Sequence, residues 1–294
     1  MSQKPNQSSG RTGLAAVVIA SGCCSFALAA CAARVTQSPA AATTAGRLAV
    51  TSTTDLKAIA SLEGHSLFTA HCAPCHGATG GGRGPAAIAL SVAPRDFRHE
   101  RFRYVSTLNG VPTEDDLIQS IRFGRRFGEM PANPQLTDAE LRTLARYIRE
   151  IQRLGWLAVL REEFADDEDT SPDELEEISH IRVNPRDPIH VVRPERGFQR
   201  DLDMGRTLYA ESCASCHGLT GRGDGLDKPL DEQGRPISVR DLTSGEYRGG
   251  TKVEEIFKRI RCGVPGTPMS AAAALTDEEV WQLVYYVRYL AGRK

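Results

Sequence analysis

The chain has 294 residues, which is enough for two domains of ordinary size, and its 40% hydrophobic and 25% charged residues indicate a globular protein. A formal net charge of -1 gives no bulk electrostatic reason to expect a nucleic-acid partner. Aromatic residues make up only 6% of the chain, which is few for two hydrophobic cores unless another apolar group fills them.

Residues 1–30 have the layout of an export signal, with Lys4 and Arg11 before an apolar run that is too short for a confident membrane span. The sequence LAAC at 28–31 resembles a bacterial lipoprotein box, which implies cleavage before Cys31 and lipid attachment to it. Simple cleavage after Ala27-Leu28-Ala29, or an uncleaved anchor helix, are the alternatives. Residues 31–55 are rich in Ala, Thr and Ser and predict a flexible tether. We therefore expect a periplasmic protein, tethered to the membrane by lipid.

The rest of the chain repeats itself. The sequence CAPCHG at 72–77 matches CASCHG at 213–218, and GHSLF at 64–68 matches GRTLY at 205–209, both at an offset of 141. Towards the end of each half, LTD at 136–138 matches LTD at 275–277 at an offset of 139. This duplication predicts two domains, 56–157 and 204–294, whose length differences fall in loops.

Helices are expected at the same places in each half. A first helix, 62–72 or 204–213, precedes the Cys-containing motif, and a middle helix at about 113–123 or 253–262 ends at a glycine. The last helix begins with a capping box, Thr137 with Glu140 or Thr276 with Glu279, and continues with apolar residues at helical spacing. With no convincing run of strands, the chain is predicted to be all-α.

The segment 158–203 differs from both halves. From 157 to 203 the sequence carries six Lys/Arg against fourteen Asp/Glu, a balance of -8. Ser171-Pro172-Asp173-Glu174 predicts the start of a short capped helix, and the proline-containing stretch 184–194 predicts extended chain. We expect a structured, acidic connector between the two domains.

The motif Cys-x-x-Cys-His is the signature of covalent haem attachment, and it occurs with Cys72, Cys75 and His76 and again with Cys213, Cys216 and His217. In this chemistry each thiol adds to a vinyl group of the porphyrin and the adjacent histidine binds the iron. A structural zinc site would need four ligands, a thioredoxin-like redox pair would need a βαβ context, and plain disulfides leave the repeated histidine unexplained. The sequence therefore predicts two covalent haem c groups.

Methionines at matching positions are the candidates for the second axial ligand of each iron. Met130 lies 54 residues after His76 and Met269 lies 52 residues after His217, each in a loop just before the last helix. A thioether is a soft donor that raises the haem potential relative to a second histidine. The alternative, two methionines of the core, explains the duplicated loop positions less well.

With these motifs in place, each half resembles a class I cytochrome c domain, and the pair resembles dihaem cytochromes of bacterial respiratory chains. The resemblance implies a small helical fold around each haem, in which the carbonyl of a proline after the motif accepts a hydrogen bond from the ligand histidine. Pro85 and Pro229 are the candidates for that carbonyl, unless they only stiffen their loops. Arg95 and Arg240 are candidates for contacts to haem propionates, or for a local pair with the aspartate that follows each.

Two other features leave alternatives open. Cys262 could be an axial ligand, as in some dihaem sulfur-oxidising enzymes, but its counterpart in the first half is Phe123, which favours a buried apolar cysteine. Arg122, Arg125 and Arg126, before Met130, could surround an exposed haem edge and attract an acidic partner, or form a solvated helix end.

The predicted function is electron transfer between a redox donor and an acceptor, because two six-coordinate irons leave no site for substrate. The alternatives are a dihaem enzyme, either a peroxidase or a thiosulfate-oxidising protein, and the cytochrome subunit of a larger oxidoreductase complex. The latter would still be an electron carrier rather than an enzyme in its own right.

Overall fold

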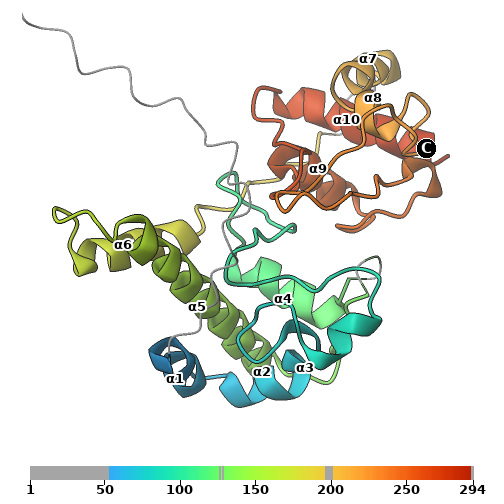
Figure 1. Cartoon of the computed structure of the whole chain (residues 1–294). Helices are drawn as coiled ribbons and strands as arrows, with labels where there is room; N and C mark the ends of the chain where they lie inside the picture. The colour runs from blue at the N-terminus through green and yellow to red at the C-terminus, as the bar shows by residue number, and fades with distance from the viewer. Residues whose placement is uncertain (1–52, 126, 128, 196–200, 293–294) are drawn as a thin grey trace, which may run out of the picture. The chain divides into compact units, whose positions relative to one another are not determined.

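The chain folds into helices joined by long loops (Figure 1). The computed structural model describes residues 53–125, 127, 129–195 and 201–292. The predicted signal, Cys31 and all but the end of the predicted tether lie outside these residues. Leu48–Lys294 form one compact unit. Within the described residues there are isolated β-bridges but no strand, so the all-α prediction is confirmed.

The first half contains three helices before and within the Cys motif and two after the loop that follows it. Its elements are α1 (Thr53–Ser61), α2 (His65–His71), α3 (Ala73–His76), the 3-10 helix η1 (Pro85–Ala89), α4 (Glu114–Phe123) and α5 (Asp138–Glu163). The second half repeats this order with α7 (Leu202–Ser212), α8 (Ala214–His217), η2 (Leu242–Ser244), α9 (Val253–Cys262) and α10 (Asp277–Leu290). The predicted middle helices therefore agree with α4 and α9.

Both last helices begin with the predicted capping boxes. In α5 the Thr137 side chain accepts from the Glu140 backbone N–H and the Glu140 carboxylate accepts from the Thr137 backbone, and Thr276 and Glu279 do the same in α10. Leu141, Leu144, Ile148 and Ile151 in α5, and Val280, Leu283, Val284 and Val287 in α10, are buried in the cores of their halves.

In each half, the helix before the Cys motif (α2 or α7) meets the last helix (α5 or α10) at a glycine. A Cβ at Gly64 would lie 3.0 Å from Cγ2 of Thr143 in α5, and a Cβ at Gly205 would lie 2.7 Å from the carbonyl oxygen of Gln282 in α10. Glycine is therefore needed at this repeated position because the two helices approach closely there. The crossing fixes where each Cys motif starts relative to the last helix.

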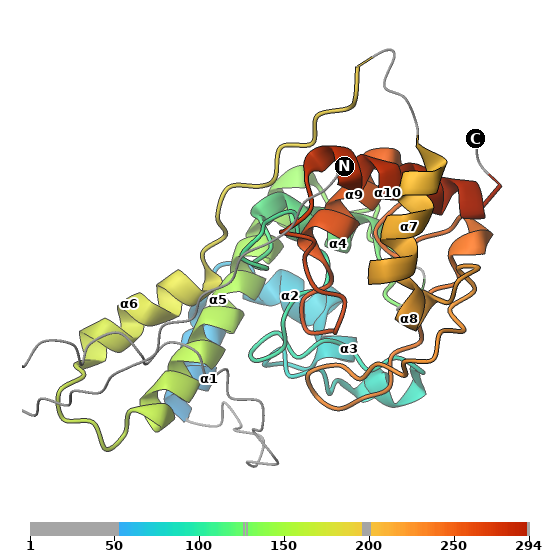
Figure 2. The ribbon, with the colours of Figure 1, turned by 90° about the horizontal axis from the view of Figure 1, so that it is seen from above.

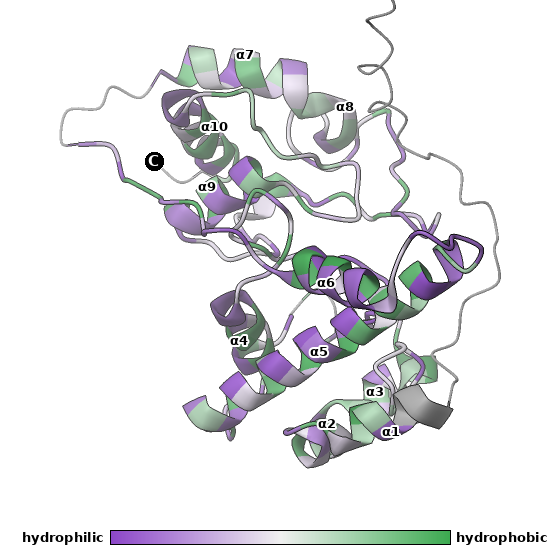
Figure 3. Cartoon of the chain, turned by 90° about the vertical axis from the view of Figure 1, so that its left-hand side faces the viewer, coloured by the Kyte–Doolittle hydropathy of each residue, from purple (hydrophilic) through white to green (hydrophobic). Residues whose placement is uncertain are grey.

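The connector has a helix and a small core of its own. Helix α5 continues to Glu163, six residues into the predicted connector, and α6 (Pro172–Val183) begins with the predicted cap at Ser171. Helix α6 packs along the C-terminal part of α5, as Figure 2 shows, and buries Leu175 against Leu157 and Leu160. Apolar and polar residues alternate along α5 in Figure 3, as expected for a helix with one packed face.

After α6 the chain is extended, as predicted for 184–194. Ile189 donates from its backbone to the carbonyl of Ser106 (2.7 Å), and the Trp281 indole N–H donates to the carbonyl of Val192 (3.0 Å). The connector is thus bonded to both halves. Among the described residues, no helix is long and apolar enough to cross a bilayer.

Candidate haem-binding sites

Each Cys-x-x-Cys-His motif forms one short helical turn, α3 or α8, directly after α2 or α7. The backbone N–H of His76 donates to the carbonyl of Cys72 (2.8 Å), and that of His217 donates to Cys213 (2.9 Å). This i to i+4 geometry places two thiols and one imidazole along the same turn. The two motifs therefore have the same local structure, as their sequences predict.

The four motif cysteines are free thiols, so the disulfide alternative is not supported. Burial raises the pKa of Cys72 to about 12 and that of Cys213 to about 11, and a neighbouring cysteine of the motif adds to each shift. Within the described residues, no group of three or more His, Cys, Asp or Glu side chains could hold a metal ion. The free thiols are available for covalent attachment.

The motif histidines are oriented by main-chain carbonyls, but not by those of the predicted prolines. Nδ1 of His76 lies 3.0 Å from the carbonyl oxygen of Arg95, and Nδ1 of His217 lies 3.2 Å from that of Arg240. With Nδ1 bonded in this way, Nε2 is the ring nitrogen left to bind an iron. Burial lowers the pKa of both histidines, which favours the neutral ring that a metal needs.

The assignment of Pro85 and Pro229 to this hydrogen bond is therefore wrong. Pro85 is exposed at the start of η1, directly after Gly84. The carbonyl of Pro229 accepts instead from the backbone N–H of Ile237 (2.9 Å). The two prolines are also not equivalent, because Pro85 follows Gly84 at once whereas Pro229 comes four residues after the matching Gly225.

The glycine-rich loops bring the arginine carbonyls to the rings. In the first half Gly82 donates to the carbonyl of His76 (2.7 Å), and Phe97 donates to the carbonyl of Gly80 (2.8 Å). In the second half the same two bonds run from Gly223 to His217 (2.8 Å) and from Leu242 to Gly221 (2.6 Å). Each loop thus closes on its own motif. The arginine lies two residues before the donor of the closing bond, Phe97 or Leu242, and its carbonyl reaches the imidazole.

The methionine loops also have matching geometry. Arg125 donates from its backbone to the carbonyl of Met130 (2.8 Å), and Val264 donates to the carbonyl of Met269 (2.8 Å). A glycine precedes each donor: a Cβ at Gly124 would lie 2.4 Å from the carbonyl oxygen of Met130, and one at Gly263 would lie 2.5 Å from that of Met269. The pairing of the two methionines in the sequence therefore corresponds to one repeated loop structure.

Glu129, beside Met130, is a residue that the sequence analysis did not identify. Its backbone has a positive φ of 58°, and its carboxylate accepts from the backbone N–H groups of Ser91 (2.7 Å) and Val92 (3.1 Å) and from the Ser91 hydroxyl (2.8 Å). The bonds connect the methionine loop of the first half to the segment after η1. The second half has Pro268 at this position, so the repeat gave no signal for it.

The arginine side chains differ between the halves. Arg95 forms an ion pair with Glu100 (2.5 Å), whereas the Arg240 guanidinium bonds to the carbonyl of Glu246 and lies 3.8 Å from the centre of the Phe127 ring. Neither arginine pairs with the aspartate that follows it. Asp96 binds Arg98, and the Asp241 carboxylate accepts from Thr243, so the local Arg–Asp alternative is not what the structure has.

The remaining candidates have structural roles. Cys262 is buried at 5% exposure, and burial raises the pKa of its thiol to about 11, as for a small apolar residue of the core. Arg122 forms an ion pair with Asp138, and Arg125 bonds to Ser120 and lies over the ring of Tyr104. Of this arginine group, Arg126 lies outside the described residues.

The surroundings of both motifs fit a large flat apolar group. Ile88, in the 3-10 helix that packs on α3, is 95% exposed, and Leu226, beside the glycine that packs on Cys216, is 94% exposed. Met269 is also partly exposed. A porphyrin held by the thiols would offer these apolar side chains a surface to pack against. The residues present therefore fit haem c.

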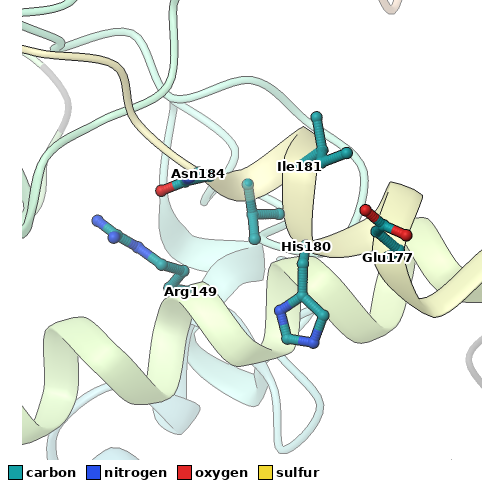
Figure 4. Close-up of a pocket in the computed structure, with 6 residues that line it drawn as sticks. Arg149, Glu177, His180, Ile181 and Asn184 are labelled. Atoms are coloured by element: carbon teal, nitrogen blue, oxygen red, sulfur yellow. The ribbon is translucent and has the colours of Figure 1, made fainter.

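A groove beside α5 and α6 lies apart from these motifs. The groove has a volume of about 290 Å³. Figure 4 shows Arg149, His180 and Asn184 among its lining residues. Its lining contains no cysteine or methionine, and the Arg149 guanidinium is bonded to the carbonyl of Pro112 (2.9 Å). The groove therefore lacks the thiols and thioethers of the two predicted haem sites.

Comparison with known protein families agrees with the duplicated sites. Residues 60–148 match the family described as "Cytochrome C oxidase, cbb3-type, subunit III", and residues 202–291 match the family "Cytochrome c". The chain is 24% identical to the cbb3-type cytochrome c oxidase subunit FixP of Bradyrhizobium diazoefficiens over 81% of its length, and 24% identical to subunit CcoP of Azospirillum brasilense over 82%. It spans 64% and 65% of the length of these relatives.

A solved structure gives the same picture at the level of the whole fold. A chain of the reducing HAO-like protein complex of Kuenenia stuttgartiensis is 29% identical, with a TM-score of 0.63. The match covers 78% of the present chain and 95% of that chain. Most of the chain therefore has a counterpart of known structure.

Proposed function

Because the chain is a dihaem cytochrome with two cytochrome c domains and one covalent haem c in each, we propose that it relays electrons as a subunit of a larger bacterial oxidoreductase complex. Electron transfer by c-type haems is its function, and in this proposal the chain acts as a carrier and not as an enzyme. The observation that carries the proposal is the equal construction of the two sites, in which an oriented histidine is matched by a methionine loop of the same geometry.

The residues of the two motifs have distinct roles in this proposal. The thiols of each pair form the thioether links, and one histidine and one methionine complete the coordination of each iron: Cys72, Cys75, His76 and Met130 in the first domain, and Cys213, Cys216, His217 and Met269 in the second. When bound, each haem supplies a one-electron carrier, whereas the protein sets its ligands, burial and hydrogen bonds.

The protein's own groups hold both coordination positions in place. The carbonyls of Arg95 and Arg240 fix the tautomer and the orientation of the imidazoles. The bonds to the carbonyls of Met130 and Met269 hold the thioether loops. With both axial positions filled by protein, neither site offers a free position for peroxide, thiosulfate or another substrate.

The test of closed sites uses methionine variants. We expect the reduced protein to bind no carbon monoxide, and an optical redox titration to show two low-spin haems, each with a methionine–iron band in the oxidised state. Met130→Ala and Met269→Ala should each open one haem to carbon monoxide. Met204→Ala is the matched control because Met204 is exposed on α7, and it should change neither spectrum nor binding. Carbon monoxide binding by the undamaged parent protein would refute the ligand assignment.

An enzymatic role is the second candidate, and Cys262 is the one feature that favours it. Steady-state assays with peroxide and with thiosulfate distinguish the two roles. A carrier turns over neither substrate in the absence of a partner. The burial of Cys262 in the core of the second half supports the carrier role.

The proposal of a larger complex is supported by the printed names of the relatives, which are subunits of cbb3-type cytochrome c oxidases. We expect this chain to receive electrons from one redox protein and pass them to another, at least one of them within the same complex. Purification from membranes in mild detergent tests this point. A chain recovered only as a free monomer, with full haem content, would contradict it.

Attachment to the membrane through lipid at Cys31, after export to the periplasm, remains part of the proposal. The lipoprotein-box sequence at 28–31 supports it. Cys31→Ser should abolish labelling by a radioactive fatty acid and release the protein from membranes into the periplasm. Cys23→Ser is the control, because its preceding residues match the box less well. A Cys31→Ser protein that still carries the label would refute the anchor.

A further inference from the structure

Glu129 has a backbone conformation that the rest of the described chain leaves to glycine. Its φ of 58° lies in the left-handed region, and no other non-glycine residue has a positive φ in the part of the chain that the structure describes. A Cβ makes this conformation costly, so it persists only where surrounding contacts hold it. Glu129 stands directly before Met130, in the loop that the backbone bond from Arg125 to the Met130 carbonyl closes. The strained residue therefore adjoins the proposed ligand of the first haem.

The contacts that hold Glu129 come from a segment 38 residues earlier in the chain. Its Oε2 accepts from the backbone N–H groups of Ser91 (2.7 Å) and Val92 (3.1 Å), and its Oε1 accepts from the Ser91 hydroxyl (2.8 Å). Ser91 follows η1, which packs on α3, the helical turn that contains His76. One exposed carboxylate thus makes three hydrogen bonds between the methionine loop and the segment that follows the Cys motif.

The second domain joins the same two parts of the fold through main chain alone. Ser91 lies 15 residues after His76, and Glu232 lies 15 residues after His217. The backbone N–H of Glu232 donates to the carbonyl of Gly266 (3.1 Å), in the methionine loop of its own domain. The bond between this position and the methionine loop is therefore repeated, but in the first domain a side chain accepts it.

The second methionine loop is also bonded within itself. The backbone N–H of Met269 donates to the Thr267 hydroxyl (3.2 Å), and that hydroxyl donates to the carbonyl of Val264 (2.7 Å). Pro268 stands where the first loop has Glu129, and its ring fixes the backbone there. These restraints do not depend on a carboxylate.

We propose that Glu129 is a positioning residue for Met130, and that its carboxylate keeps the thioether on the iron of the first haem by tying the methionine loop to the segment after η1. Histidine and methionine bind opposite faces of a haem, so bonds between the segments that carry them resist movement of the methionine away from the iron. The three bonds are strengthened because their acceptor is charged. The inference rests on the proposed ligation of the first iron by His76 and Met130.

The two haems then differ in what holds their methionine. In the first domain the ligand depends on one exposed side chain, and in the second it depends on the main chain and on Thr267. Loss of the Glu129 carboxylate should therefore loosen the methionine of the first haem and leave that of the second in place. A residue that only stabilises the fold would change thermal stability without this difference between the haems.

The test uses the full-length protein with both haems attached. Glu129→Gly removes the carboxylate and introduces a residue that adopts a positive φ without strain, so the effect of the lost bonds is measured by itself. Glu129→Gln keeps the length of the side chain and an oxygen that accepts from the two backbone donors. Glu168→Gly is the control, because Glu168 is also an exposed glutamate in a turn, between α5 and α6.

Imidazole is the probe, because it binds an oxidised six-coordinate iron only by displacing the methionine. The shifted NMR signals of the two ligand methionines in the oxidised protein, assigned with Met130→Ala and Met269→Ala, show which haem releases its ligand. Hydrogen exchange at the backbone amides of Ser91 and Val92 reports the bonds to the carboxylate directly.

Glu129→Gly should raise the affinity of the first haem for imidazole on the order of tenfold, the size of about one charge-assisted hydrogen bond, and should speed exchange at the two amides. The second haem should be unchanged, and Glu129→Gln and Glu168→Gly should resemble the parent protein. If Glu129→Gly does not retain haem, Ser91→Ala removes one of the three bonds from the opposite segment. It should raise the same affinity by about threefold.

Unchanged imidazole affinity in Glu129→Gly with both haems attached would overturn the inference, even if thermal stability fell, because Glu129 would then have a structural role alone. An equal rise at both haems would also overturn it. Both results leave the proposed function intact. A parent protein without two ligand-methionine signals would instead refute the proposed function.

Discussion

Gly263→Ala should detach the methionine ligand from the second haem and leave the first haem intact. Gly263 ends α9 with φ +66° and ψ -158°, a backbone conformation that is almost confined to glycine. A Cβ at this position would lie 2.5 Å from the carbonyl oxygen of Met269 and 2.5 Å from the carbonyl carbon of Ser270. Both contacts are to main chain, so no side-chain rotation relieves them.

The size of the effect follows from these contacts. An ordinary contact begins at 3.4 Å, so the Met269 carbonyl must recede by about 0.9 Å, and the loop that carries the thioether moves with it. The backbone conformation alone costs roughly 1–3 kcal/mol for a residue with a Cβ. A thioether–iron bond is weak and strictly directional, so a loop displacement of this size is expected to break it.

Gly234→Ala is the matched control for backbone strain. Gly234 also has a positive φ (+73°), but a Cβ there would meet nothing within 4 Å. We expect it to lower the free energy of unfolding by about 1–2 kcal/mol and to leave both haems unchanged. Optical spectra should show one methionine–iron band in Gly263→Ala and two in Gly234→Ala, and only the former should bind carbon monoxide, at one haem. If Gly263→Ala keeps both bands and binds none, the reasoning about the methionine loop is refuted.

Three further variants test other parts of the molecule. Cys262→Ala should retain both closed haems and lose roughly 1 kcal/mol of stability, measured by thermal unfolding; loss of a haem ligand band would show that the buried thiol binds iron. Tyr209→Phe removes the hydroxyl that donates to the carbonyl of Gly218 (2.8 Å) and should cost about 1 kcal/mol, and an unchanged midpoint would mean that water replaces the bond. The pKa of Glu279 is lowered by the Thr276 backbone and hydroxyl donors, so its contribution to stability is present above its unfolded pKa and is lost as the pH falls through the folded pKa. Glu279→Gln should therefore flatten the loss of stability below about pH 4.5, and an acid-unfolding curve identical to that of the parent would contradict this.

The duplicated motifs made it possible to predict most of the helices and, for each site, to propose the cysteines, the histidine and the methionine. The capping boxes at Thr137 and Thr276 and the middle helices are local features, so their signals lie within a few neighbouring residues. The paired methionines were found because the duplication served as an internal alignment. The predicted start of α6 at Ser171 is also present, since it rests on one proline and one cap.

The acceptor of the histidine hydrogen bond could not be found in this way. A main-chain carbonyl belongs to every residue, so no residue type marks the position that reaches the ring. The loops after the two motifs also differ in length, which placed Pro229 out of register with Pro85. Side-chain contacts between distant residues could not be predicted either. The guanidinium carbon of Arg259 lies 5.0 Å from the centre of the Tyr104 ring, although the two residues are more than 150 positions apart in the sequence.

At Arg95 and Arg240, the orientation of the ligand histidine and the charge near the haem depend on different parts of the same residue. The main-chain carbonyl sets the orientation, and the side chain sets the charge. Any residue at these positions would keep the imidazole in its orientation, because the main chain alone makes the bond. The side chain at the same position can therefore change during evolution without disturbing the ligand. In each repeat, charge near the haem can be adjusted by substitution while the geometry of coordination is inherited unchanged, so duplicated domains can diverge in redox properties from one common scaffold.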